Sequence, residues 1–136
     1  MTPKPQAFIA LPREASESGL QNVIEQALHN NGVEPVSISI ANFKSASTIT
    51  ANIQDLIRKT SFVVADVSGA NPNVMLEVGM AMGMGKPMLL LSRSRAPELP
   101  FDLAAQQVAV YKPDDLPTVR KYLELWLRDV IAERVS

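Results

Sequence analysis

Short apolar runs alternate along this chain with stretches in which apolar residues recur at every third or fourth position. Short continuous apolar runs are typical of strands buried on both faces of a sheet, and they occur at residues 6–11, 62–67 and 88–92. Residues 33–40 alternate apolar and polar side chains after a proline, which predicts a half-buried strand at or near a sheet edge. Residues 107–111 predict a short fifth strand.

The stretches between these strands have the spacing of amphipathic helices. The first helix is expected over residues 20–28, with a stop signal at 30–32, and the second is expected to be capped by Ser47 or Thr48. A third helix follows the strand at residues 62–67, which is the third strand in chain order. The last helix covers residues 116–131.

The third helix carries Gly79 and Gly83, which lie four residues apart and so on one face. Glycine costs about 1 kcal/mol relative to alanine inside a helix. Two glycines on one face therefore indicate close approach to the sheet or to another chain.

Alternation of strands and helices predicts one α/β domain that covers residues 1–136. We expect a flavodoxin-like, three-layer α/β/α fold with a five-stranded parallel sheet in the order 2-1-3-4-5. In open sheets of this kind ligands bind at the carboxyl ends of the strands. A site would therefore collect the loops after strands one, three and four.

Composition narrows the possible functions. Apolar residues make up 46% of the 136 residues, enough to bury a core, and the formal net charge is -1. This balance gives no sign of a nucleic-acid or membrane surface, and no apolar stretch is long enough to span a bilayer. The lack of cysteine excludes disulfide and thiolate chemistry, and a single histidine, His29, excludes a histidine-rich metal site. We expect a cytoplasmic protein without a metal or a bound cofactor.

The loop and helix after the third strand carry the strongest candidate chemistry. Asp66 ends the strand, and Glu77 lies in the first turns of the helix, where the helix dipole would favour its ionised form. Glu77 is either a nucleophile or general base, or a surface glutamate matched to the dipole. Asn71 and Asn73 either hold a hydroxyl-rich ligand or cap the helix, and capping is the simpler account.

Other polar residues follow the neighbouring strands. Ser68 and Gly69 could form a phosphate-binding turn before a helix N-terminus, although the glycine spacing matches neither common nucleotide-binding motif. Arg13 follows strand one and Arg93 follows strand four, so both could reach a phosphate or carboxylate ligand. Solvated loop charges explain these two arginines equally well.

The segment 66–87, D-V-S-G-A-N-P-N-V-M-L-E-V-G-M-A-M-G-M-G-K-P, resembles the signature of bacterial TIR-like nucleotide-binding proteins. It is also similar to the nucleoside 2-deoxyribosyltransferases and the deoxynucleoside monophosphate N-glycosidases. The opening F-I-A-L-P-R-E, which includes Leu11, Pro12 and Arg13, resembles the first strand and loop of the TIR-like group. L-P-F-D-L at 99–103 and the strand that ends in Tyr111 match this group as well.

The resemblance implies a nucleoside or nucleotide ligand and a Glu77 that attacks the anomeric carbon of a sugar to cleave or transfer an N-glycosidic bond. Asp66 would support the sugar hydroxyls or orient the glutamate, and the residues that contact substrate would be Leu11, Pro12, Arg13, Ser68, Gly69, Asn71, Asn73 and Arg93. NAD is a possible substrate, and a homodimer or higher homo-oligomer is expected.

Two departures from the pattern favour an alternative. Residues 8–14 lack the tyrosine that the transferases place near the end of strand one, and Met75 stands where the TIR-like helix usually has an aromatic residue. The alternative is a non-catalytic nucleotide sensor or an oligomerising signalling module of the same fold. A flavin-binding or phosphoacceptor protein is a poorer match, because the acidic cluster and the stacking aromatics are missing.

Overall fold

A computed structural model of the chain describes residues 4–13, 19–37, 46–94 and 108–135. Its five strands are all parallel and lie in the order β2-β1-β3-β4-β5, which confirms the predicted flavodoxin-like α/β/α fold. In chain order the elements are β1 (Gln6–Ala10), α2 (Leu20–Asn30), β2 (Glu34–Val36), α3 (Ala46–Lys59), β3 (Phe62–Asp66), the 3-10 turn η2 (Ser68–Ala70), α4 (Pro72–Gly83), β4 (Met88–Ser92), β5 (Val108–Val110) and α6 (Leu116–Val135).

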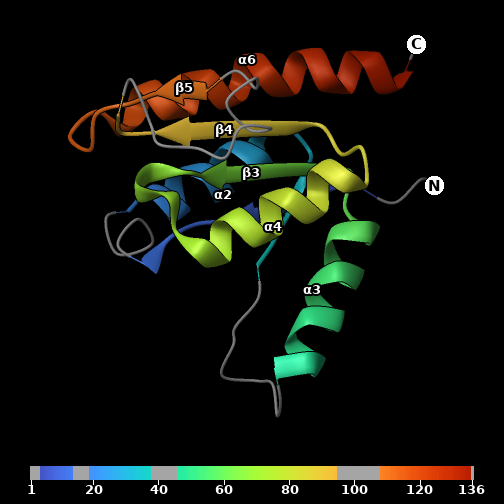
Figure 1. Cartoon of the computed structure of the whole chain (residues 1–136). Helices are drawn as coiled ribbons and strands as arrows, with labels where there is room; N and C mark the ends of the chain where they lie inside the picture. The colour runs from blue at the N-terminus through green and yellow to red at the C-terminus, as the bar shows by residue number, and fades with distance from the viewer. Residues whose placement is uncertain (1–3, 14–18, 38–45, 95–107, 136) are drawn as a thin grey trace.

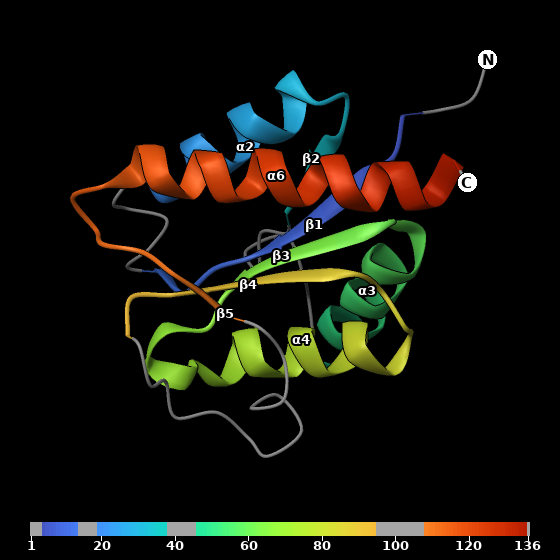
Figure 2. The same ribbon diagram turned by 90° about the horizontal axis from the view of Figure 1, so that it is seen from above.

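Helices cover both faces of the sheet, with α2 and α6 on one face and α3 and α4 on the other (Figure 2). Successive residues of a strand point to opposite faces. Ile9 of β1 accordingly packs in the α2–α6 layer, and its neighbour Phe8 packs in the α3–α4 layer. Trp126 of α6 meets Phe62 edge to face, with ring centroids 5.8 Å apart, and so anchors this helix to the core.

Three details differ from the sequence predictions or lie outside the described residues. β2 is an edge strand as predicted, but it stops at Val36. Helix α3 begins at Ala46, so the prediction that Ser47 or Thr48 caps it is wrong, because both residues lie inside its first turn. The L-P-F-D-L segment at 99–103 lies outside the described residues.

Gly79 and Gly83 lie on the exposed face of α4, because the buried face is made by Val74, Val78 and Ala81. A methyl group added to either glycine would meet no atom within 4 Å among the residues that the structure describes. The predicted close approach of these glycines to the sheet is therefore wrong, and contact with another chain stays a prediction.

Replacing Gly79 by alanine is expected to raise the free energy of unfolding by about 1 kcal/mol, because the change removes backbone entropy from the unfolded chain without a clash. Urea denaturation measures this change. Gly69→Ala is the control and should destabilise, because Gly69 has a φ of 70° that an alanine adopts only with strain. A loss of stability in Gly79→Ala would show that this face is packed against something.

Candidate functional site

The carboxyl ends of β1, β3 and β4 meet at one edge of the sheet. The register pairs Ala10 with Ala65 and Asp66 with Leu91, so Leu11 and Asp66 lie side by side at this edge. In Figure 1 the arrowheads of β3 and β4 point to the same side, where the chain turns through η2 into α4. The topology thus brings the predicted loops together, as parallel strands require.

Asp66 is fully buried at the end of β3. Its Oδ1 accepts a hydrogen bond from the N–H of Ser68 at 2.8 Å, and its Oδ2 accepts one from the hydroxyl of Tyr111. Each carboxyl oxygen therefore has a partner inside the protein, which is what a buried polar group needs.

The turn after β3 has an unusual backbone. Gly69 and Ala70 both have left-handed conformations, with φ values of 70° and 48°. The conformation is easy for glycine and strained for alanine, so neighbouring contacts have to hold Ala70 in place. The N–H of Ala70 donates to the carbonyl of Val67 at 3.0 Å, and the N–H of Arg93, just after β4, donates to Oγ of Ser68 at 2.9 Å.

Asn71 caps α4. Its Oδ1 accepts hydrogen bonds from the N–H groups of Asn73 and Val74 at 2.9 and 3.3 Å, and Pro72 occupies the first helical position. Capping, the simpler account of Asn71, is therefore what the structure shows, while the side chain of Asn73 is exposed. The N–H groups of Asn73 and Val74, and that of Ser68, already donate to protein oxygens, so a phosphate at this helix terminus would lack these three donors.

Glu77 is the sixth residue of α4 and is half-buried. Burial raises the pKa of its carboxyl from 4.5 to about 7. Burial thus outweighs any effect of the helix dipole, which acts mainly in the first turn, whereas Glu77 lies in the second. A carboxyl with a pKa near neutrality is ionised or protonated with equal ease, as acid–base and nucleophilic groups often are.

The two arginines lie at the same sheet edge as Asp66. Arg13 is exposed and follows the buried Pro12 at the end of β1, and Arg93 is exposed after β4. The pKa of Tyr111 lies above its ordinary value, first because of burial and then because of Asp66, whereas the positive charge of Arg93 acts to lower it. Arg93 is therefore close enough to Tyr111 to influence its ionisation.

Sequence reasoning did not place Tyr111 in the site. It follows β5, which lies two strands away from β3, and its bond to Asp66 joins residues that are 45 positions apart. The available signal was the predicted strand at 107–111, which ends in Tyr111. In the predicted strand order it lies beside the strand that precedes Arg93.

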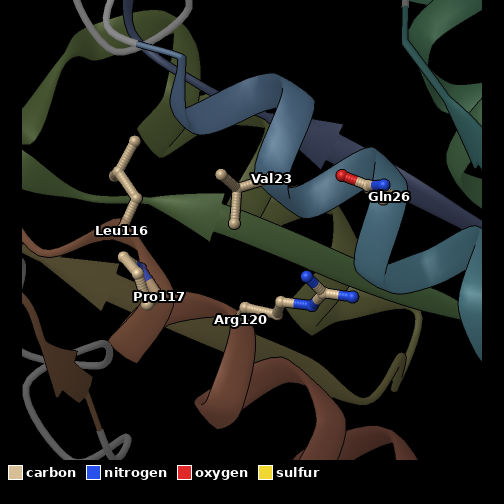
Figure 3. Close-up of a pocket in the computed structure, with 5 residues that line it drawn as sticks. All are labelled: Val23, Gln26, Leu116, Pro117 and Arg120. Atoms are coloured by element: carbon tan, nitrogen blue, oxygen red, sulfur yellow. The ribbon is translucent and has the colours of Figure 1, made fainter.

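A shallow pocket of about 140 Å³ lies between α2 and α6, on the sheet face that α4 does not cover. Figure 3 shows Val23 and Gln26 of α2 and Leu116, Pro117 and Arg120 of α6 around it. None of these residues belongs to the predicted site. The pocket is smaller than usual small-molecule sites, which reach roughly 300 to 1,000 Å³.

In the ranges that the structure describes, no helix is long and apolar enough to cross a bilayer. The same ranges hold no group of three or more histidine, aspartate or glutamate side chains placed to bind a metal ion.

Comparisons with known proteins find similarity at the level of structure. No family model and no curated sequence gives a significant match to this chain. A CMP N-glycosidase from Clostridium botulinum superposes with a TM-score of 0.65 at 21% identity, over 88% of this chain and 98% of that one. A 2-deoxyribosyltransferase from Leishmania mexicana has a TM-score of 0.63 at 18% identity, over 86% and 97%. The TIR domain of a Toll-related receptor from Hydra magnipapillata has a TM-score of 0.63 at 17% identity, over 90% and 97%.

These likenesses confirm the fold that the motif resemblance implied. The chain has the fold that nucleoside 2-deoxyribosyltransferases, N-glycosidases and TIR domains share.

Proposed function

We propose that this protein cleaves or transfers the N-glycosidic bond of a nucleoside, a nucleoside monophosphate or NAD, with Glu77 as the nucleophile. The observation that carries the proposal is the half-buried Glu77 with a carboxyl pKa of about 7, on the helix that begins at the predicted site edge. The fold shared with an N-glycosidase and a deoxyribosyltransferase supports this reaction class.

In the proposed reaction the Glu77 carboxylate attacks the anomeric carbon as the bond from carbon to base nitrogen breaks. The bonding electrons leave with the base, and a glycosyl ester forms on Glu77. A nucleoside base takes a proton from the solvent as it leaves, whereas the nicotinamide of NAD, which is cationic when bound to the sugar, leaves neutral without one. Water or a second base then attacks the same carbon, gives up a proton to the solvent and releases the carboxylate. The transition state has oxocarbenium character, which a neighbouring carboxylate stabilises.

The other candidate residues have supporting roles in this proposal. Arg13 and Arg93 supply positive charge for a phosphate or a sugar hydroxyl, and Leu11 and Pro12 form the wall beside them. Gly69, on the exposed turn after β3, allows the sugar to approach the backbone closely. No metal or cofactor takes part.

Release of free base tests the proposal. Purified protein is incubated separately with NAD, ribonucleosides, deoxyribonucleosides and their monophosphates, and the products are separated by chromatography. Release from one of these classes is expected, and addition of a second base distinguishes transfer from hydrolysis. Absence of release from every compound at high protein concentration would overturn the proposal.

One observation favours a second candidate, the non-catalytic sensor or assembling module. Leu76 is 52% exposed, and together with Gly79 and Gly83 it forms an uncharged outward face on α4. A face of this kind suits contact with a second copy of the chain. Calorimetric binding of a nucleotide without base release, together with sedimentation that depends on protein concentration, would support this candidate over the enzyme.

A further inference from the structure

Tyr111 reaches across the end of β4 to the end of β3. It follows β5, is 4% exposed, and donates its hydroxyl hydrogen to Oδ2 of Asp66. Its own N–H donates to the carbonyl of Ser92 at 2.9 Å. Because β4 lies between β5 and β3 in the sheet, the tyrosine joins the ends of three neighbouring strands.

The Tyr111 bond continues through a chain of contacts into the turn after β3. Asp66 accepts the Ser68 N–H on its other oxygen, and Ser68 accepts the Arg93 N–H on its hydroxyl. The turn contains Ala70, whose positive φ needs support from its surroundings. Removal of the Tyr111 hydroxyl would leave a buried carboxylate oxygen without its partner and free Asp66 to rotate away from Ser68.

We infer that Tyr111 is a positioning residue which, through Asp66, locks the turn between β3 and α4 and thereby sets the position of Glu77. The lock itself follows from the contacts described, whereas its effect on Glu77 rests on the proposed function. Asp66 acts in the same way, because it is fully buried and both of its oxygens are engaged inside the protein. It orients the turn and does not contact the sugar.

Amide hydrogen exchange, followed by NMR, tests the lock without any substrate. Tyr111→Phe should speed exchange of the Ser68 and Arg93 amides at least about tenfold relative to a reference amide. Tyr122→Phe is the matched control, since the Tyr122 hydroxyl donates to the carbonyl of Val110 at 3.0 Å and has no bond to Asp66. An unchanged ratio in Tyr111→Phe would overturn the lock, and so would equal acceleration in both variants.

The reference amide is Ser61, which donates to the carbonyl of Gln6 at 2.8 Å and lies at the opposite end of β3 from the turn. Ser68→Ala tests the same lock if Tyr111→Phe fails to fold. This variant removes the acceptor of Arg93 but keeps the Asp66–Tyr111 bond. The Arg93 amide should then exchange at least about tenfold faster while the residue 68 amide stays slow. Fast exchange at both positions would overturn the inference.

Kinetics then tests the effect on Glu77. Tyr111→Phe should lower kcat for base release about 10- to 100-fold and leave KM within twofold, because misplacement of a reacting group by about 1 Å costs on this order. Tyr122→Phe should keep both constants within twofold. A raised KM with an unchanged kcat would indicate substrate contact and overturn the positioning role. If the wild-type protein releases no base, the proposed function fails, and the exchange data still decide whether Tyr111 locks the turn.

Discussion

Glu77→Gln is expected to lose base release by roughly 10³-fold or more and, at pH 8, to raise the free energy of unfolding by about 3 kcal/mol. The loss of activity follows because an amide cannot form the glycosyl ester. The gain in stability follows because burial removes water from the wild-type carboxylate, and this desolvation disfavours its negative charge.

The pH dependence of this gain follows from the pKa of Glu77. The pKa rises from 4.5 in the unfolded chain to about 7 in the folded one, so the folded protein retains a proton that the unfolded chain releases. The wild-type protein therefore loses stability as the pH rises from 4.5 to 7, and the full cost is present above 7. The variant should gain little at pH 4.5 and the full amount at pH 8.

Urea denaturation of both proteins at pH 4.5 and pH 8 measures the difference. Glu34→Gln, at an exposed glutamate of β2, is the matched control and should change stability by less than about 0.5 kcal/mol at both pH values. In the wild-type protein kcat/KM should rise to a plateau above about pH 7, because only the ionised carboxyl is a nucleophile. Full activity of Glu77→Gln would contradict the role of Glu77 as nucleophile.

Asp66→Ala is expected to lower the free energy of unfolding by roughly 2 to 5 kcal/mol. Asp66 is the acceptor for two buried donors, the Ser68 N–H and the Tyr111 hydroxyl. A buried donor without a partner costs about 1 to 3 kcal/mol, and this substitution creates two of them as well as a small cavity.

The comparison with Asp55→Ala isolates the effect of burial. Asp55 forms an ion pair with Arg58 at 2.6 Å, but the two side chains are 59% and 63% exposed, so its loss should cost less than about 1 kcal/mol. Urea denaturation at neutral pH gives both values. A loss in Asp66→Ala as small as that in Asp55→Ala would contradict the bonding of Asp66 described above.

The sheet could be predicted from the sequence because its central strands are buried on both faces. The core of β3, Val63–Ala65, has no polar residue, and such a run fits only the middle of a parallel sheet. The length of β2 could not be predicted, because its alternating pattern continues after its pairing with β1 ends at Phe8 and Val36. Alternation of apolar residues shows which face of a strand is buried, but it does not show where the pairing with a neighbouring strand ends.

The orientation of the glycines on α4 was also hidden from local reasoning. Gly79 and Gly83 share a face, but the sequence alone did not decide whether that face is buried. Val74, Val78 and Ala81 have the same helical spacing and fill the buried face, so the glycines point outward. To decide which face of the helix is buried, all of its residues have to be compared, and the face with the bulky apolar residues is the buried one.

The positions of the candidate site residues could be proposed from the sequence, but the contacts between them could not. Asp66 and Asn71 were identifiable because each stands at the boundary of an element, where their side chains have defined tasks. The pKa of Glu77 depends on how far the surrounding side chains exclude water from its carboxyl. The spacing of residues in the sequence gives no information on that exclusion. The partner of Asp66 comes from the end of another strand, so only the strand order makes Tyr111 its neighbour.

The two edge strands limit how copies of this protein can associate. Among the described residues β2 and β5 have three residues each, and Pro35 of β2 has no N–H to offer to an added strand. Long unpaired edges are the usual starting point for intermolecular strand addition and aggregation, and these short edges give it little support. Folded copies should therefore resist joining through these sheet edges, which directs contact between copies toward other surfaces, such as the outer faces of the helices.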